Sequence, residues 1–268
     1  MLKLAFSGKG GVGKTTLSSL MARIYVSKGH KVLAIDANVD ANFGTALGFS
    51  DEEIEKITPI SQMSELIEER TGAKPGTQAP YFKLNPKVDD IPDRLSVEKN
   101  GVKLLMLGSV DTGGMGCICP ESVLLTALIG HLILGRDETV LLDMDAGIEH
   151  LARGTVKGVD AFIVVVEPGQ RSIQTAKSVR KLAADLGVMK TYVVGNKITG
   201  PEDEEFVRTN LPDFEVLGFL NMAPAIRDSD FQGVSPYDVA PDSVAEAEKI
   251  VDRLEEIHGG GTNGQENG

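Results

Sequence analysis

Apolar residues occur along this chain in short continuous runs and in helical periods, and the two patterns alternate. The continuous runs, which are typical of buried strands, are residues 2–7, 31–36, 102–107, 139–143, 161–166, 191–196 and 216–220. Apolar positions at helical spacing predict helices over residues 14–28, 120–134, 172–186 and 243–258. Strands that alternate with helices predict an α/β fold, a mostly parallel twisted sheet with helices on both faces.

Two segments interrupt this alternation. Residues 51–101 are polar and proline-containing, and they end in Asn100-Gly101, a dipeptide typical of hairpin turns. We interpret them as an insertion that contains a helix near residues 60–70. Residues 259–268 contain no apolar side chain, so a disordered tail is expected there. The remainder, residues 1–258, is predicted to form a single domain.

The loop after the first strand carries the phosphate-binding motif G-x-x-x-x-G-K-[ST] in the strand–loop–helix context that the motif requires. Its glycines allow backbone N–H groups to surround phosphate oxygens, and the following helix adds its positive N-terminal end. Lys14 is expected to reach the β- and γ-phosphates, and Thr15 to place its hydroxyl on Mg²⁺. The predicted ATP-binding segment comprises Gly8, Lys9, Gly10, Gly11, Val12, Gly13, Lys14, Thr15 and Thr16.

Polar residues follow three other predicted strands. Asp143 ends an apolar run. A carboxylate at the end of a strand beside the phosphate loop is expected to hold Mg²⁺, and the alternative is an aspartate that caps a helix. Four residues later, Gly147 is placed to donate its N–H to the γ-phosphate. Asp36 also ends a strand, and Asn196 follows another, where a plain turn asparagine is the alternative.

Cys117 and Cys119 lie in a glycine-rich loop directly before Pro120, which suits the first position of a helix. A thiol near a helix N-terminus has a lowered pKa, and thiolates bind soft or borderline metals. One C-x-C supplies two ligands where a closed site needs four, so a two-fold axis through the loop would complete the site. The alternative is a pair of small buried apolar residues.

The composition and charge of the chain make several classes of function less favourable. The formal net charge of -12 disfavours binding to nucleic acid and to anionic lipid, so neither is expected as a partner. No apolar run approaches the roughly 18 residues of a membrane span, and the N-terminal residues do not form a signal-peptide pattern. Two cysteines spaced two apart are no disulfide framework, so a cytoplasmic location is expected.

The octamer K-G-G-V-G-K-T-T resembles the signature of the deviant Walker A ATPases, which include nitrogenase iron protein, MinD and ParA. The resemblance implies that Lys9 crosses a dimer interface to the partner's nucleotide, and that Asp36 lies near Mg²⁺. The family's second switch aspartate, which orients the attacking water, is replaced by Asn38, whose amide cannot take a proton. Asp40 stands two residues later as a substitute. The resemblance further implies an adenine site made by Asn196, Lys197, Met222, Ala223 and Pro224.

The C-x-C after a glycine run, together with residues 143–155, resembles the CooC family of accessory ATPases for nickel insertion into carbon monoxide dehydrogenase. This implies a cytoplasmic homodimeric ATPase that uses ATP/ADP and Mg²⁺. It also implies that Cys117 and Cys119 of both subunits bind Ni²⁺ or Zn²⁺, with carbon monoxide dehydrogenase as the client. Two positions depart from the family pattern, namely Asn38 and Asp145, which stands where a small residue is expected.

Two alternative functions stay open. An iron–sulfur carrier or electron-transfer ATPase related to nitrogenase iron protein would also place four cysteines on a dimer axis, and it would be brown and oxygen-sensitive. A positioning ATPase such as ParA or MinD is the third reading. Membrane-binding members end in a basic amphipathic helix, whereas residues 243–258 are acidic overall.

Replacing the motif lysine tests the nucleotide assignment. We expect Lys14→Ala to abolish ATP binding, because the phosphates lose their main cation and the loop geometry fitted to it. Titration of the purified variant with ATP and Mg²⁺ measures this, and undiminished affinity would contradict the phosphate-loop assignment.

Overall fold

The computed structural model describes residues 1–38, 42–76, 81–108, 119–144 and 158–259. Its centre is an eight-stranded sheet in the order β3-β4-β2-β5-β1-β6-β7-β8. The strands are β1 (Lys3–Ser7), β2 (Val32–Ala37), β3 (Val97–Lys99), β4 (Val102–Met106), β5 (Thr139–Met144), β6 (Ala161–Val166), β7 (Thr191–Ile198) and β8 (Glu215–Asn221). All neighbours pair in parallel except β3 and β4, so the carboxyl ends of seven strands lie at one edge of the sheet.

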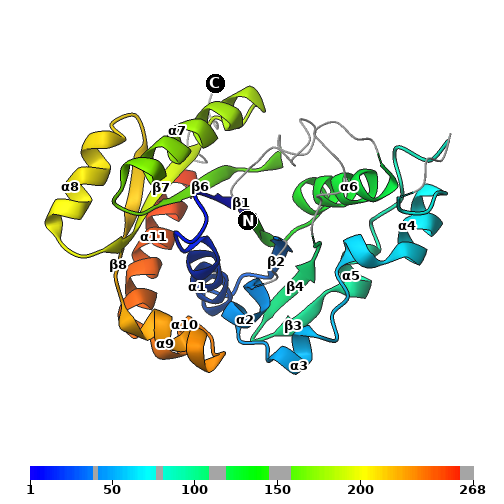
Figure 1. The fold of residues 1–268 in the computed structure, drawn as a ribbon, viewed down its shortest axis with the longest axis horizontal. Helices are drawn as coiled ribbons and strands as arrows, with labels where there is room; N and C mark the ends of the chain where they lie inside the picture. The colour runs from blue at the N-terminus through cyan, green and yellow to red at the C-terminus, as the bar shows by residue number, and fades with distance from the viewer. Residues whose placement is uncertain (39–41, 77–80, 109–118, 145–157, 260–268) are drawn as a thin grey trace, which may run out of the picture.

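Helices cover both faces of the sheet (Figure 1). One face is covered by α1 (Lys14–Ser27), α2 (Phe43–Leu47) and α11 (Pro241–Gly259). The opposite face is covered by η1 (Ile60–Gln62), α4 (Ser64–Thr71), α5 (Ile91–Leu95), α6 (Pro120–Leu134), α7 (Gln170–Asp185) and α8 (Pro201–Asn210). Three short helices complete the described chain: α3 (Asp51–Ile54), α9 (Pro224–Gln232) and α10 (Pro236–Val239).

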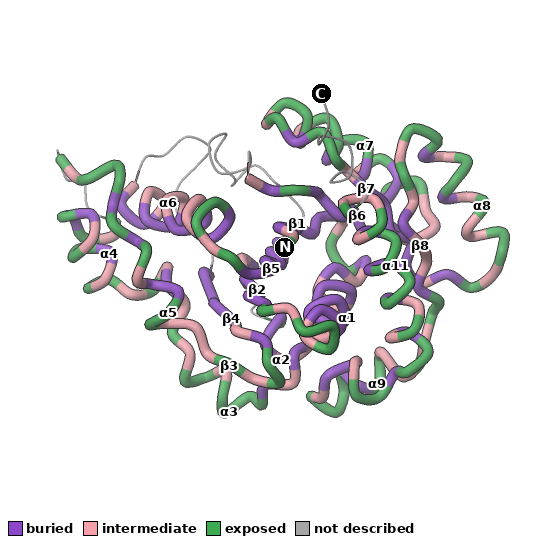
Figure 2. Tube along the Cα trace, turned by 180° about the vertical axis from the view of Figure 1, so that it is seen from behind, coloured by how far each residue is buried: buried purple, intermediate pink, exposed green. Residues whose placement is uncertain are grey.

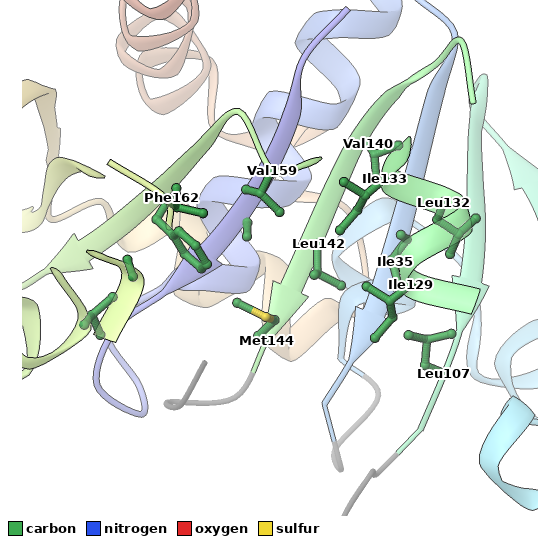
Figure 3. Packing of buried hydrophobic residues seen from close by; sticks show 14 of the residues in the cluster. Ile35, Leu107, Ile129, Leu132, Ile133, Val140, Leu142, Met144, Val159 and Phe162 are labelled. Carbon is green, nitrogen blue, oxygen red and sulfur yellow. The ribbon is translucent and has the colours of Figure 1, made fainter. Parts of the chain in front are cut away.

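Two apolar cores, one on each face, result from this arrangement. Adjacent strand residues point to opposite faces, so Leu141 packs toward α1 while Val140 and Leu142 pack toward α6. Figure 3 shows the second contact, in which Ile129 and Ile133 of α6 lie against β5 and β2. Figure 2 shows the buried strands at the centre and exposure on the outer helices. A parallel sheet covered on both sides needs strands that are apolar at nearly every position, which is the pattern seen in the sequence.

The expected α/β architecture is therefore confirmed, and strand and helix boundaries agree within about two residues. The Asn100-Gly101 dipeptide forms the turn between β3 and β4, with positive φ angles of 54° and 78°. The sequence did not reveal β3 itself, nor α8, which joins β7 to β8. In α8, three acidic residues in the first turn and only one buried residue, Val207, leave too weak an apolar period to recognise.

Residues 51–101 contain α3, η1, α4, α5 and β3, and η1 with α4 spans the region where a helix was expected. Their apolar side chains join the core on the α6 side through Ile60, Ile67 and Ile91. The predicted tail lies outside the described residues, apart from Gly259. In the described part of the chain, no helix combines the length and apolar character that crossing a membrane requires.

Candidate functional site

The phosphate loop begins where β1 ends and continues directly into α1. Gly8, Gly11 and Gly13 have φ angles of 143°, 77° and 95°, a region that side chains with a Cβ rarely adopt. A Cβ on Gly8 would collide with the Val165 carbonyl, and one on Gly13 with the side chain of Asn196. A Cβ on Gly10 or Gly11 would meet nothing within 4 Å. The loop is thus packed on its protein side and open on the side where a phosphate would bind.

Two functional side chains of α1 lie beside this loop. The Lys14 side chain is nearly buried, and its ammonium lies 3.5 Å from the Lys9 carbonyl oxygen, at the edge of hydrogen-bonding distance. Thr15 donates its hydroxyl to Oδ2 of Asp143 at 2.6 Å. Thr16 occupies the next position in the first turn of the helix. A helix N-terminus with a lysine at its first position favours an anionic ligand.

Strand register brings two carboxylates together at the carboxyl edge of the sheet. Asp36 on β2 is the direct partner of Asp143 on β5, and both residues are buried. The Asn38 amide nitrogen lies between them, 2.9 Å from Oδ1 of Asp36 and 3.1 Å from Oδ2 of Asp143. The backbone N–H groups of Asn38 and Phe43 also donate to Asp36, each at 3.1 Å. Asn38 therefore holds the two carboxylates in place.

Burial dominates the electrostatics of Asp143. Its pKa is raised from 3.8 to about 7, mainly by desolvation and to a smaller extent by the nearby charge of Asp36. The hydrogen bond from Thr15, the charge of Lys14 and the hydrogen bond from Asn38 act in the opposite direction without cancelling the effect of burial. A carboxylate whose pKa is shifted this far by burial is a candidate for a functional site.

The residues present suit Mg²⁺, which prefers oxygen ligands and retains several waters. Oδ1 of Asp143 is buried and has no hydrogen-bond partner among the described residues. The Thr15 hydroxyl lies on the other oxygen of the same carboxylate. Asp36 is nearby, but hydrogen bonds from protein donors already reach both of its oxygens. Thr15 and Asp143 would therefore lie closest to a bound Mg²⁺, with Asp36 behind them.

Asn196 and Lys197 brace the phosphate loop from β7. The Asn196 amide donates to the Val12 carbonyl at 2.7 Å, and the Lys197 ammonium donates to the Gly11 carbonyl at 2.6 Å. Lys197 has a φ of 59°, a left-handed conformation that is uncommon for a lysine. In this structure both side chains are thus engaged with the loop itself, and their assignment to adenine stays a prediction.

Lys9 forms an ion pair with a residue that sequence reasoning gave no role. Its ammonium lies 3.2 Å from Oε1 of Glu167, and the Lys197 ammonium lies 3.5 Å from Oε2 of the same carboxylate. Glu167 directly follows β6, which pairs with β1, so it necessarily lies beside the phosphate loop. The sequence did contain a signal for this contact, because Glu167 is a carboxylate that directly follows a predicted strand, residues 161–166.

Met222, Ala223 and Pro224, the predicted base-covering segment, follow β8. They line a pocket of about 590 Å³ together with the first residues of α11, including Pro241 and Ser243. The Met222 side chain is 55% exposed, so it is available for contact with a ligand.

Some predicted site residues cannot be placed. Asp40, Gly147 and Cys117 lie outside the described residues, as does Asp145. Cys119 is half-buried and is the N-cap residue of α6, with Pro120 at the first helical position as expected. Within the ranges that the structure describes, no group of three or more His, Cys, Asp or Glu side chains is arranged to hold a metal ion.

Residues 3–237 match the family model described as the CobQ/CobB/MinD/ParA nucleotide binding domain. The chain is 44% identical over 240 residues to the carbon monoxide dehydrogenase accessory protein CooC of Rhodospirillum rubrum, covering 90% of this chain and 91% of CooC. It is also 44% identical over 252 residues to an uncharacterized ATP-binding protein of Methanocaldococcus jannaschii, covering 93% and 96% of the two chains.

Solved structures share the fold. The MinC:MinD cell division protein complex of Aquifex aeolicus gives a TM-score of 0.68 at 20% identity, covering 100% of this chain and 99% of that chain. MinD of Pyrococcus horikoshii complexed with Mg-ADP gives a TM-score of 0.65 at 19% identity, covering 97% and 98%. At this identity, the likeness establishes the fold alone.

The raised pKa of Asp143 has a consequence for stability. Between pH 3.8 and about 7 the folded protein binds more protons at Asp143 than the unfolded chain does, so this residue makes the protein less stable as pH rises through that window. We expect Asp143→Asn to raise the free energy of unfolding by about 1–3 kcal/mol at pH 8.5 without nucleotide or Mg²⁺, below the ceiling of about 4 kcal/mol that the shift implies. The gain should be smaller at pH 6.

Urea unfolding at the two pH values measures this gain, with the exposed residue Asp213 replaced by Asn as the matched control. If the Asp143 variant is no more stable than the parent at pH 8.5, the conclusion that the buried Asp143 charge destabilises the fold is wrong.

Proposed function

The chain belongs to the CobQ/CobB/MinD/ParA family of nucleotide-binding domains and is a homologue of CooC, and from this premise we propose that it is an ATP-dependent metallochaperone. In this proposal the protein hydrolyses ATP as a homodimer, binds Ni²⁺ or Zn²⁺ through cysteines shared between subunits, and assists nickel insertion into carbon monoxide dehydrogenase. The 44% identity to CooC over nine-tenths of both chains supports the client.

The observation that carries the ATPase activity is the convergence of Lys14, Thr15 and Asp143 at one edge of the sheet. Lys14 opens α1 beneath the loop and would neutralise phosphate charge, while the loop glycines leave room for the phosphate oxygens. Thr15 and Asp143 would hold Mg²⁺, which neutralises charge on the β- and γ-phosphate oxygens when bound. Phosphoryl transfer depends mostly on such positioning and on electrostatic stabilisation.

The place of Cys119 supports the metal-binding part of the proposal. As the N-cap residue of α6 it lies at the positive end of a 15-residue helix, which stabilises a thiolate. With Cys117 two residues earlier, each subunit contributes two sulfur ligands. Two subunits related by a two-fold axis would then form a four-ligand site, and nucleotide-dependent closure would change its geometry.

The metal stoichiometry tests the shared site. We expect one divalent ion per dimer, bound by Cys117 and Cys119 of both subunits and lost in a Cys117→Ala/Cys119→Ala variant. Affinity should fall as pH is lowered, because the thiolates are protonated. Metal analysis combined with size-exclusion chromatography, with and without ATP, measures this.

One ion per monomer in the dimeric fraction would contradict the shared site. A brown protein containing iron and sulfide would instead support an iron–sulfur carrier. The Lys14→Ala variant is the control for the ATP-dependent part, since it keeps both cysteines.

Asn38 provides a test of the hydrolytic step. Its amide donates to two carboxylates, and an amide cannot accept a proton from an attacking water. We expect Asn38→Asp to raise ATP turnover at saturating Mg²⁺ by at least about tenfold, since a positioned acid–base group contributes roughly 10²–10⁴-fold. At this saturating Mg²⁺ concentration ATP affinity should change little, because Lys14, Thr15 and Asp143 remain and the cation offsets the charge added beside Asp36 and Asp143.

Steady-state turnover and equilibrium ATP binding are compared for the two proteins, with Asn38→Ala as the control that removes the amide without adding a carboxylate. Equal turnover in the parent and the aspartate variant would show that position 38 does not handle the water, and Asp40 would be the next residue to replace.

A further inference from the structure

Glu167 contacts two partly exposed lysines at the mouth of the phosphate loop, Lys9 and Lys197. Its Oε1 lies 3.2 Å from the Lys9 ammonium and its Oε2 lies 3.5 Å from the Lys197 ammonium. We propose that Glu167 is a positioning residue that holds Lys9 within its own subunit while nucleotide is absent, and that this ion pair must break before two subunits close on ATP. The inference rests on the proposed function, because it concerns the nucleotide-dependent dimer.

The position of this carboxylate is fixed by the backbone around it. Glu167 directly follows β6, the strand beside β1, and its N–H donates to the Ser172 hydroxyl at 3.1 Å in the first turn of α7. Pro168 restricts the following φ angle. The side chain therefore starts from a constrained point next to the loop. A glutamate there presents its negative charge to the same lysines that a phosphate would attract.

Lys197 shows that the contact restrains more than one side chain. Its ammonium lies between Glu167 and the Gly11 carbonyl, and its backbone is left-handed. Its N–H donates to the Asn196 side chain, which itself donates to the Val12 carbonyl. Glu167 thus links Lys9 to a network that holds the loop carbonyls. Release of Lys9 from Glu167 leaves Lys197 as the remaining cation on that carboxylate.

Solvent exposure limits the strength of the restraint. The side chains of Lys9, Glu167 and Lys197 are 39%, 29% and 38% exposed, so each pair is partly screened by water. One such pair is worth up to about a fivefold change in an equilibrium constant. A symmetric dimer must break the Lys9 pair in both subunits, which gives up to about a 25-fold effect on the dimer dissociation constant.

The variant Glu167→Gln tests the proposal because it keeps the side-chain length and removes the charge. At saturating ATP and Mg²⁺ we expect its dimer dissociation constant, measured by sedimentation velocity, to fall by about 3- to 25-fold. The matched control is Glu215→Gln, which removes a carboxylate paired with Arg253 at 3.1 Å at the start of β8, the end of that strand remote from the phosphate loop. A change below twofold, or weaker association, in Glu167→Gln overturns the proposal.

A second measurement needs neither ATP nor a dimer. Reductive methylation with formaldehyde and cyanoborohydride, followed by peptide mass spectrometry, reports how readily the Lys9 amine reacts. Without nucleotide, Lys9 should react faster in Glu167→Gln than in the parent and in the Glu215→Gln control, and equal rates would overturn the proposal. If Glu167 only stabilised the fold, its replacement by glutamine would lower the unfolding temperature and leave the reactivity of Lys9 unchanged.

The two measurements separate this inference from the proposed function. If the parent protein does not dimerise with ATP, the dimeric function fails, while Lys9 labelling still decides whether Glu167 holds that lysine. If the parent dimerises and Glu167→Gln behaves like it in either measurement, the positioning role fails and the proposed function stands.

Discussion

Two carboxylates buried side by side at the carboxyl edge of a parallel sheet constrain the rest of this site. Asp36 and Asp143 are register partners on β2 and β5, so the hydrogen-bonding of the sheet holds them together whether or not a cation is present. Burial opposes ionisation of Asp143, and the charge of Asp36 increases the effect. The free energy for this arrangement comes from the two apolar cores that cover the sheet.

The charged groups of the site are paired with one another and with neighbouring polar groups of the same chain. Thr15 and Asn38 donate to the carboxylates, Glu167 pairs with Lys9 and Lys197, and carbonyl oxygens of the loop accept from lysine ammonium groups. Each of these groups would bind one of the proposed ligands more strongly than it binds its present partner in the chain. Mg²⁺ suits the carboxylates and phosphate suits the lysines, so ligand binding would exchange internal contacts for external ones. An exchange of this kind would make the loop responsive to nucleotide.

The residues on which the proposals rest lie at the ends of regular elements, where the sheet constrains the chain least. Asn38 follows β2, Glu167 follows β6 and Cys119 precedes α6, so each lies at the end of a regular element. Strand ends at the carboxyl edge of a parallel sheet can change side chains without disturbing the cores, and ligands bind there in open α/β sheets. The substitution of asparagine for the expected aspartate at position 38 is such a change.

The sequence by itself determined the α/β architecture, the phosphate loop, the pairing of helices with strands and the hairpin turn at Asn100-Gly101. These features depend on local order: apolar periodicity, glycines at positions of positive φ, and a motif whose parts are adjacent in the chain. Helix α8 and strand β3 were missed because their apolar patterns are short and weak. Only the tertiary structure decided which side chains meet, because register and strand order bring together residues far apart in the chain. It placed Asn38 between Asp36 and Asp143, turned Asn196 toward Val12, and joined Lys9 to Glu167 across 158 positions of sequence.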